Sequence, residues 1–420
     1  MYLGVIADDF TGATDVAGFL VNNGLRTLQL NGVPEAPVDI EADAVVISLK
    51  SRSCSAQRAI EQSLAALKWL QTHGCQRFFF KYCSTFDSTA EGNIGPVTDA
   101  LLEALGEPFT VVCPALPVNG RTTYQGYLFV NGVPLNESGM RHHPVTPMTD
   151  ANLMRVMEGQ ASGQAGNVAV EQIEKGVEAV RAQLNRLKQQ GKRYAVLDAL
   201  SDQHLQIVGE AVEGFKLVTG GSGLADGMTR HWEGRPNADQ AGAPNVGSTV
   251  ILAGSCSEMT NRQVTAYRDC AASLAIAPDR AMAKDLTAYV NELVDWFARQ
   301  PNAPHAPLIY ATMPPAELKQ VQERYGAHHA SERIEMLFGA LATALSDTGV
   351  SRFIIAGGET SGAVTQALGI NGFIIGPQIA PGVPWVKALD HSKSLALKSG
   401  NFGADTFFFD AQRIANQNTD

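Results

Sequence analysis

The chain has 420 residues, a formal net charge of −10 and 45% hydrophobic residues, a composition typical of a globular protein. Because one ordinary hydrophobic core does not organise a chain of this length, two domains are expected. The excess of acidic over basic residues argues against nucleic acid or an anionic membrane surface as the main partner.

The cysteines and the hydrophobic pattern indicate a cytoplasmic location. The six cysteines form no Cys-x-x-Cys pair and show no metal-ligand spacing with histidine, which is typical of reduced thiols. No apolar run is long enough to cross a bilayer, and Asp8 and Asp9 come too early for a secretory signal peptide. We therefore expect a cytoplasmic protein with no membrane partner.

The first stretch of the chain predicts a strand, a polar turn and a helix. Residues 2–7 are an apolar run of strand length, Asp8 and Asp9 follow at once, and apolar residues then recur at helical spacing. Because ligands bind at the carboxyl ends of strands in open α/β sheets, these two carboxylates are candidate catalytic groups. The structural alternative is an N-cap formed by Asp9 or Thr11, but one cap accounts for one acidic residue, and this turn has three with Asp15.

Strands and helices alternate through the first half of the chain. Short apolar runs predict further strands at residues 44–49, 78–82, 109–113, 194–198 and 215–219. Helical periodicity predicts helices at residues 55–72, 94–105 and 170–190. Residues 114–149, rich in Pro, Gly and Asn, are expected to form a long functional loop. The alternation predicts a parallel sheet covered by helices on both faces.

A second α/β series follows a region without apolar pattern near residues 224–248. We place the first domain at residues 1–235, a linker at 236–248 and the second domain at 249–420. The strands predicted in the second domain span residues 250–254, 353–356, 373–375 and 406–409. The helices predicted there span residues 258–270, 283–299, 314–324 and 331–346, with a short one that ends at 368. The tail after Arg413 is expected to fray.

Three polar turns at strand ends in the second domain suggest one extended nucleotide site. In the turn at residues 357–362, glycines allow close approach of backbone N–H groups to a phosphate, Thr360 and Ser361 add hydroxyl groups, and a helix begins. Residues 254–257 repeat this arrangement at the end of another predicted strand, and residues 399–403 offer a third flexible loop. The alternative is that these glycines only form tight turns.

Two familiar nucleotide fingerprints are absent. No GxxxxGK[ST] motif occurs, which excludes a Walker-type ATPase. Residues 221–223 begin like a dinucleotide fingerprint, but Asp226 stands where its third glycine should be, which weakens an NAD-dependent function.

Basic and polar residues near strand ends in the first domain indicate a small anionic substrate with hydroxyl groups. Four basic residues lie at or after strand ends: Lys50, Arg52, Lys81 and Arg121. Arg suits a planar carboxylate and Lys a point contact, although each alone is also compatible with a solvated surface charge. Residues 83–93, with Asp87 and Asn93, gather the polar side chains that sugar hydroxyls require, unless they only cap a helix.

These motifs together resemble the four-carbon acid sugar kinase family, and most closely its 3-oxo-tetronate kinase branch. The resemblance covers almost the whole chain. Its first-half motifs are Ile6-Ala-Asp-Asp-Phe-Thr-Gly-Ala-Thr-Asp15, Lys81-Tyr-Cys-Ser-Thr-Phe-Asp-Ser-Thr89, Gly92-Asn-Ile-Gly95, Asn119-Gly-Arg121 within residues 114–126, and His143-Pro-Val-Thr-Pro-Met148. Its second-half motifs are Gly254-Ser-Cys-Ser257, Gly357-Gly-Glu-Thr-Ser-Gly362, Pro381-Gly-Val-Pro384 and Lys398-Ser-Gly-Asn-Phe-Gly403.

The resemblance implies an N-terminal acid-sugar-binding domain and a C-terminal ATP-binding domain, with the active site in the cleft between them. The implied reaction is ATP-dependent phosphorylation of the 4-hydroxyl of a 3-oxo-tetronate, with Mg²⁺ neutralising phosphate charge. We expect Asp8 or Asp9 to orient or deprotonate that hydroxyl. The expected substrate ligands are Arg52, Lys81, Asp87, Asn93 and Arg121. The expected ATP ligands are Ser257, Gly358, Glu359, Thr360, Ser361, Gly362 and Gly403.

Alternatives remain at this point. Threonate and erythronate kinases of the family tend to have a basic residue where this chain has Glu91, which favours the oxo-tetronate branch but leaves those kinases as an alternative. A non-catalytic sugar-acid sensor or binding protein is the alternative of another class, and an NAD-dependent dehydrogenase is a weaker one. The metal ligands stay undetermined, and a homodimer fits the sequence as well as a monomer.

Overall fold

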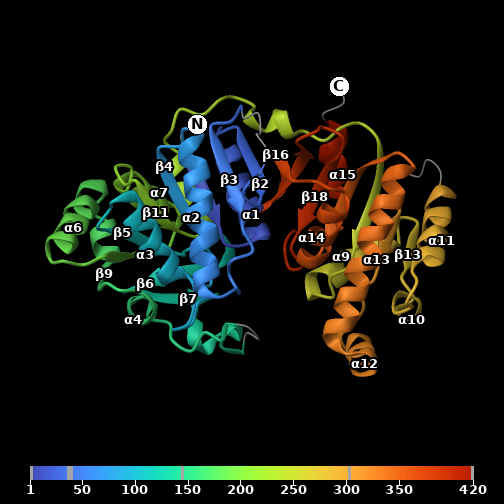
Figure 1. Cartoon of the computed structure of the whole chain (residues 1–420), viewed down its shortest axis with the longest axis horizontal. Coiled ribbons are helices and arrows are strands. Elements are labelled where there is room, and N and C mark those ends of the chain that lie inside the picture. The colour runs from blue at the N-terminus through green and yellow to red at the C-terminus, as the bar shows by residue number, and fades with distance from the viewer. Residues whose placement is uncertain (1–2, 36–40, 143–145, 301–303, 418–420) are drawn as a thin grey trace. The chain divides into compact units, whose positions relative to one another are not determined.

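The computed structural model describes residues 3–35, 41–142, 146–300 and 304–417. The chain divides into two compact units, Met1–Ala238 and Asp239–Asp420, and each consists of strands flanked by helices (Figure 1). The expected α/β class with mostly parallel strands in both halves is confirmed. None of the helices in the described ranges is long and apolar enough to cross a membrane.

All neighbouring strands in the main sheet of the first unit are parallel. In spatial order they are β2 (Thr27–Asn31), β3 (Ala44–Ser48), β1 (Leu3–Ala7), β4 (Arg77–Lys81), β11 (Leu217–Gly220), β5 (Thr110–Cys113), β10 (Tyr194–Leu197) and β9 (Ala165–Val168). The register places Ala7 beside both Ser48 and Lys81, so β1, β3 and β4 end at the same edge. Polar residues that follow these strands are therefore close in space.

Helices cover both faces of this sheet. The connections β1–α1–β2 and β3–α2–β4 run in opposite directions along the strand order, and because such crossovers are right-handed, α1 and α2 lie on opposite faces. Helix α8 packs on α1 and on α7, whereas α3 packs on α2 and on α4. The helices are α1 (Phe10–Asn22), α2 (Ala56–Thr72), α3 (Ile94–Leu105), α4 (Leu153–Gln160), α5 (Val170–Ile173), α6 (Val177–Gln189), α7 (Asp202–Ala211) and α8 (Ser222–Thr229).

The segment at residues 114–149, expected to be a loop, contains a small antiparallel sheet. Buried Asp198 holds its first turn, since its carboxylate accepts the N–H groups of Gln125 at 2.7 Å and Gly126 at 2.9 Å. Strands this short show little hydrophobic periodicity, so the sequence pattern did not predict them. The elements are η1 (Pro117–Asn119), β6 (Arg121–Tyr124), β7 (Tyr127–Val130), β8 (Val133–Pro134), η2 (Leu135–Glu137) and η3 (Gly139–His142).

The sheet of the second unit is mixed. Its strands, in spatial order, are β13 (Ser273–Ala275), β14 (Leu308–Tyr310), β12 (Ser248–Ala253), β15 (Val350–Ala356), β18 (Ser394–Lys398), β17 (Val383–Ala388) and β16 (Gly372–Ala380). The pairs from β13 to β18 are parallel, and β17 is antiparallel to both of its neighbours. Ala253, Ala356 and Lys398 are in register, so β12, β15 and β18 also end at one edge.

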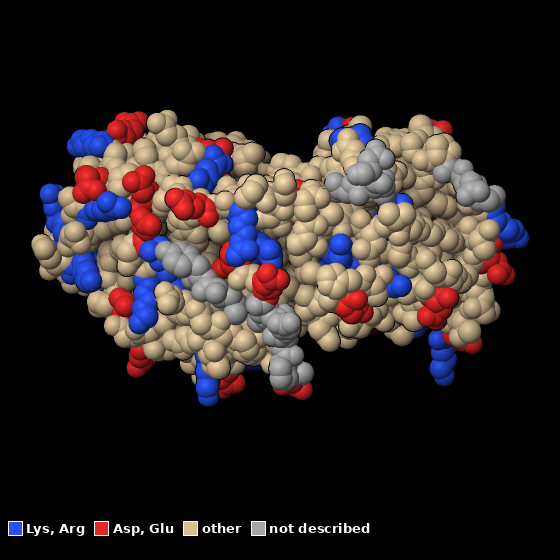
Figure 2. Space-filling view, turned by 90° about the horizontal axis from the view of Figure 1, so that it is seen from above, with Lys and Arg blue, Asp and Glu red and all other residues tan. Residues whose placement is uncertain are grey.

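The helices of the second unit pack around a core that includes Trp385, Tyr267 and Phe408. Charged side chains of both signs are interspersed over the face seen in Figure 2, with no continuous basic patch, as expected for a net charge of −10. The elements are η4 (Ala238–Gly242), α9 (Glu258–Arg268), α10 (Pro278–Ala281), α11 (Thr287–Ala298), α12 (Pro315–Tyr325), α13 (Ala327–Asp347), α14 (Gly358–Ala367) and α15 (Phe407–Gln417).

Two predicted elements are wrong. The strand expected at residues 406–409 is the start of α15, whose buried residues Phe407, Phe408, Ala411 and Ala415 have helical spacing, and the helix continues past Arg413 to Gln417. The helix expected at residues 170–190 is two helices, because Gly176 adopts a φ of 93° between them.

Candidate functional site

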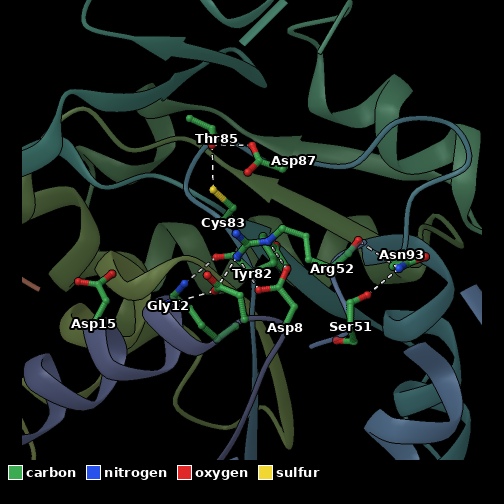
Figure 3. A network of polar contacts seen from close by, with 12 residues as sticks. Asp8, Gly12, Asp15, Ser51, Arg52, Tyr82, Cys83, Thr85, Asp87 and Asn93 are labelled. Carbon is green, nitrogen blue, oxygen red and sulfur yellow. Dashed lines mark hydrogen bonds and ion pairs between the residues drawn. The ribbon is translucent and has the colours of Figure 1, made fainter. Parts of the chain in front are cut away.

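The carboxyl ends of β1, β3 and β4 bring together four charged side chains that the sequence singled out, of which Figure 3 labels Asp8 and Arg52. Asp8 and Asp9 follow β1 directly, Arg52 lies in the loop after β3, and Lys81 is the last residue of β4. The loop is fixed to β1, since the N–H groups of Ser51 and Arg52 donate to the carbonyl oxygen of Asp8 at 3.0 and 3.2 Å.

The guanidinium of Arg52 bridges both aspartates. Its Nε donates to Asp8 Oδ2 at 2.9 Å, and its Nη2 lies 2.7 Å from Asp8 Oδ1 and 2.7 Å from Asp9 Oδ1. Burial by itself lowers the pKa of Arg52, but the two carboxylates raise it well above its ordinary value, so the guanidinium stays charged. Its Nη1 has no hydrogen-bond partner within the described residues, which leaves one donor group for a ligand.

The two aspartates differ in how far their oxygens are occupied. Asp8 is 5% exposed, and Arg52 engages both of its carboxylate oxygens. Asp9 uses Oδ1 for Arg52 and for the N–H of Gly12 at 3.1 Å, so it is also the N-cap of α1. Its Oδ2 has no donor in the described part of the chain, and its side chain is 28% exposed. Asp9 therefore combines the cap with an oxygen open to a ligand.

Lys81 and Asp15 extend this group of charges. Lys81 is buried, and its Nζ donates to the carbonyl oxygen of Tyr82 at 2.9 Å. Asp15 is buried beneath the turn and accepts a hydrogen bond from the Ser222 hydroxyl. Burial raises the pKa of the Asp15 carboxyl, and the positive charge of Lys81 opposes that rise. Lys81 therefore acts electrostatically on both Asp8 and Asp15.

Asn93 holds the loop that carries Arg52. Its Nδ2 donates to the carbonyl oxygens of Ser51 at 2.7 Å, Arg52 at 3.2 Å and Cys54 at 2.9 Å. The side chain is buried, and its amide group is committed to these contacts. The structure therefore gives Asn93 a positioning role for Arg52.

A chain of polar contacts leads from Cys83 to Asp87 (Figure 3). The Cys83 thiol lies 2.8 Å from the Thr85 hydroxyl, which donates to Asp87 Oδ1 at 2.6 Å. Burial raises the pKa of the Cys83 thiol to about 11, and the charge of Asp87 adds to the rise. The thiol is therefore protonated near neutral pH and acts as a polar contact rather than as a nucleophile.

Arg121 does not join this network. It begins β6 in the small sheet, and its Nη1 donates to the carbonyl oxygen of Asn119, with no ion pair to a described residue. Part of the motif at residues 143–148 lies outside the described residues.

In the second unit, the three predicted polar turns begin at one edge of the sheet. The N–H of Gly254 donates to the carbonyl oxygen of Ala356 at 2.9 Å, and the N–H of Gly357 donates to that of Lys398 at 2.8 Å. Gly357 has a φ of 130°, a conformation that favours glycine. Helix α14 starts at the next residue without a side-chain cap, which leaves its first N–H groups available to an anion.

A cavity of about 270 Å³ adjoins these turns. Backbone groups and polar side chains line one side of the cavity, and apolar side chains line the other. The polar side includes Gly254, Ser255, Gly357, Gly358, Glu359 and Thr360. The apolar side includes Pro278, Met282, Met313, Leu318, Val321 and Ile334. An apolar wall facing a glycine-rich helix start suits a ligand with a flat apolar part and a phosphate chain.

The remaining expected ATP residues, Ser257, Ser361, Gly362 and Gly403, do not line the cavity. Ser257 caps α9, and its hydroxyl donates to the carbonyl oxygen of Gly400 at 2.7 Å. Ser361 is buried with a hydroxyl that has no hydrogen-bond partner in the described residues, and Gly403 adopts a φ of 76°. Gly362 follows Ser361 in α14 and does not line the cavity.

The described residues contain no group of three or more His, Cys, Asp or Glu side chains that could hold a metal ion. Mg²⁺ that accompanies a nucleotide needs only one or two carboxylates besides phosphate oxygens. Glu359, in the first turn of α14, is the carboxylate that lines the cavity beside the glycine-rich turn.

Two features of these sites were not predicted from the sequence: the contact of Asp15 with Ser222 and the position of Lys398 at the end of a strand. The Asp15–Ser222 hydrogen bond joins residues that are 207 positions apart, so no local pattern could reveal it. Lys398 ends a buried strand, as Lys81 does, and a lysine at the end of an apolar run was a signal available in the sequence.

Comparison with known proteins assigns both halves of the chain. Residues 3–228 match the family model of a sugar-binding N-terminal domain, and residues 250–408 match that of a nucleotide-binding C-terminal domain. A curated relative from Brucella melitensis, named 3-oxo-tetronate kinase, is 64% identical over 100% of this chain and 97% of its own length. The relative of that name from Escherichia coli K12 is 58% identical over 90% of this chain and 98% of its own length.

Solved structures of relatives share the fold. A Salmonella typhimurium LT2 protein, described provisionally as a tRNA synthase, superposes with a TM-score of 0.94 at 57% identity, covering 98% of this chain and 99% of that one. A Haemophilus influenzae protein superposes with a TM-score of 0.87 at 54% identity and the same coverage.

Proposed function

The chain belongs to the four-carbon acid sugar kinase family, and we propose that it transfers the terminal phosphoryl group of ATP to the 4-hydroxyl of a 3-oxo-tetronate. The observation that carries this proposal is the full-length identity of 49–64% to relatives named 3-oxo-tetronate kinase. The reaction fits a chain with a net charge of −10, whereas such an acidic balance does not favour binding of tRNA. Dependence on ATP supports the expected cytoplasmic location.

We assign substrate recognition to residues 1–235 and ATP binding to residues 249–420, joined by the segment at 236–248. The match of a sugar-binding model to the first half and a nucleotide-binding model to the second supports this division. Each half has its candidate ligands at the carboxyl edge of parallel strands, the usual position of ligands in such sheets.

For ATP, the base would lie against the apolar wall of the cavity, and the phosphates at the start of α14. Gly358 allows close approach of the backbone there, and the uncapped N–H groups attract negative charge. The hydroxyl groups of Thr360 and Ser361 and the turns at Ser257 and Gly403 would complete the phosphate environment. Glu359 would help to hold Mg²⁺, which would supply charge neutralisation at the phosphates.

For the sugar acid, the open Oδ2 of Asp9 is the proposed group that orients or deprotonates the 4-hydroxyl. Asp8 would hold Arg52, whose free Nη1 points to a role in binding a substrate oxygen. Lys81 lowers the charge repulsion among the aspartates, and Asp87 can accept a hydroxyl hydrogen bond. Contact of Arg121 with the substrate carboxylate stays a prediction.

The test is ADP release with Mg²⁺-ATP across 3-oxo-tetronates and their reduced tetronates, in both configurations, with no-substrate controls. Turnover confined to the oxo acids is expected. Turnover only on threonate or erythronate would keep the kinase and refute the substrate. No turnover on any acid, together with measurable binding in calorimetry, would instead support a sugar-acid binding protein.

A further inference from the structure

Lys398, at the end of β18, has its ammonium group enclosed in oxygen atoms. Its Nζ donates to Thr260 Oγ1 at 3.0 Å and to the carbonyl oxygens of Ser399 at 3.0 Å and Gly400 at 2.8 Å. The residue is 0% exposed. An ammonium group has three N–H donors, so each of them has an acceptor.

These acceptors are all neutral. No carboxylate lies within 4.0 Å of Lys398 Nζ in the described ranges, and the ring of Phe407 is 5.9 Å away on another side. Burial lowers the pKa of the Lys398 ammonium to about 7, because the charge has left water without an anionic partner. A buried cation held by carbonyl and hydroxyl oxygens is the environment that proteins offer to potassium.

The enclosed ammonium fixes the polar turn at residues 399–403. The carbonyl oxygen of Gly400 also accepts the hydroxyls of Ser257 at 2.7 Å and Thr260 at 2.8 Å. Further along, Gln263 donates to the carbonyl oxygens of the residues on either side of Gly403, Phe402 and Ala404, at 3.0 and 2.9 Å. Side chains of α9 thus hold the carbonyl oxygens of this turn, and Lys398 is the one cation that donates to those oxygens within the described ranges.

We propose that the Lys398 ammonium takes the place of a bound monovalent cation, which fixes the turn at residues 399–403 for ATP and removes any need for added potassium. The role rests on the proposed function, because the turn carries Gly403 of the ATP site. Lys398 is a positioning residue, since its Nζ is used up by protein oxygens and has no donor left for the nucleotide.

The test compares Lys398→Ala, which leaves the three oxygens facing a space of cation size, with Lys398→Met, which fills that space without charge. Lys387→Ala is the matched control, because Lys387 is also partly buried, on the neighbouring strand β17, and its side chain makes no hydrogen bond to a described residue. The dissociation constant of Mg²⁺-ATP is measured by calorimetry in choline, sodium, potassium and ammonium chloride at equal ionic strength and at about pH 6, where the Lys398 ammonium keeps its proton.

In choline chloride both Lys398 variants are expected to bind ATP at least about tenfold more weakly, since a charged hydrogen-bonding group is lost. Ammonium or potassium should bring the dissociation constant of Lys398→Ala to within about threefold of the wild-type value, but should not improve that of Lys398→Met. The dissociation constants of wild type and of Lys387→Ala should not depend on the cation. Equal behaviour of Lys398→Ala and Lys398→Met in all four salts would overturn the proposal.

Thermal melting without nucleotide separates this inference from the proposed function. Ammonium or potassium should raise the melting temperature of Lys398→Ala above its value in choline, and leave that of Lys398→Met unchanged. If the cation stabilises Lys398→Ala, but neither the wild type nor any variant binds ATP, the cation site is supported and the kinase assignment is refuted. If no cation stabilises Lys398→Ala, the cation site is refuted whether or not ATP binds.

Discussion

Replacing Asp9 by asparagine separates its structural role from its proposed catalytic one. Asparagine retains an Oδ1 that accepts the N–H of Gly12 and the Nη2 of Arg52, and it caps helices as well as aspartate does. Arg52 also keeps both bonds to Asp8. The expected loss of stability is therefore only about 1 kcal/mol, from weakening one charge-assisted contact.

The loss of rate should be far larger. Asparagine places a neutral amide where Oδ2 is open, and an amide cannot take the proton of the 4-hydroxyl. General base catalysis contributes about 10²–10⁴-fold, so kcat should fall by that factor, equivalent to about 3–5 kcal/mol in the barrier. The KM values for ATP and for the acid should change little, because the remaining contacts are unaltered.

The assay is coupled ADP release at saturating Mg²⁺-ATP and oxo-tetronate, with a melting curve for each variant. Asp43→Asn is the matched control, since Asp43 is also ion-paired to arginine but precedes β3 at the opposite edge of the same sheet. A kcat for Asp9→Asn within about threefold of wild type would refute its role as base. If Asp8→Asn were also active and Asp87→Asn inactive, the catalytic carboxylate would be Asp87.

Three further predictions follow from contacts already described. Asn93→Ala removes the three bonds that hold the Arg52 loop and should lower kcat/KM by about 10²-fold in the ADP assay, with a stability loss of about 1–3 kcal/mol in urea unfolding. Gly254→Ala places a Cβ 2.2 Å from Thr360 Oγ1, so it should displace α14, raise the KM for ATP and leave the affinity for the acid unchanged in calorimetry. For pH, burial lowers the pKa of Lys398 to about 7, whereas an unfolded lysine titrates near about 10.4, so the unfolded chain binds the extra proton between these values. The free energy of unfolding of wild type relative to Lys398→Met should therefore rise from about pH 7 to 10, by up to about 4 kcal/mol, and stay level below pH 7; a flat difference across that range would contradict the shift.

The parallel strands that the sequence predicted have local signals, whereas β2, β9, β13, β14 and β18 were not predicted. Asp8 and Asp9 stand directly after an apolar run, and the helical spacing that follows them needs no distant partner. The start of α15 was misjudged for the same reason, since three consecutive phenylalanines after Thr406 have high β propensity, and only the spacing to Ala411 and Ala415 marks a helix.

The structure brings together Asp8, Asp9, Arg52 and Lys81, which the sequence singled out, but the sequence did not show which contacts they make. Arg52, Lys81 and Asn93 were expected as ligands because of their residue types and positions. Arg52 bridges Asp8 and Asp9, and the Asn93 amide donates to the loop that carries Arg52. These contacts join residues more than 40 positions apart in the sequence. Side-chain direction across such separations is decided by packing, which no spacing rule encodes.

Each unit has a buried lysine at the end of a parallel strand, but the two lysines have different surroundings. Lys81 and Lys398 are each the last residue of a parallel strand, and each donates to the carbonyl oxygen of the next residue. Lys81 shares its surroundings with carboxylates, and its charge acts on Asp8 and Asp15. Lys398 meets only neutral oxygens, so its charge is available to order a turn and to favour an approaching anion. The role of a lysine in this position therefore depends on whether carboxylates or neutral oxygens surround it. Substitutions at those surrounding residues, and not at the lysine, would convert one role into the other.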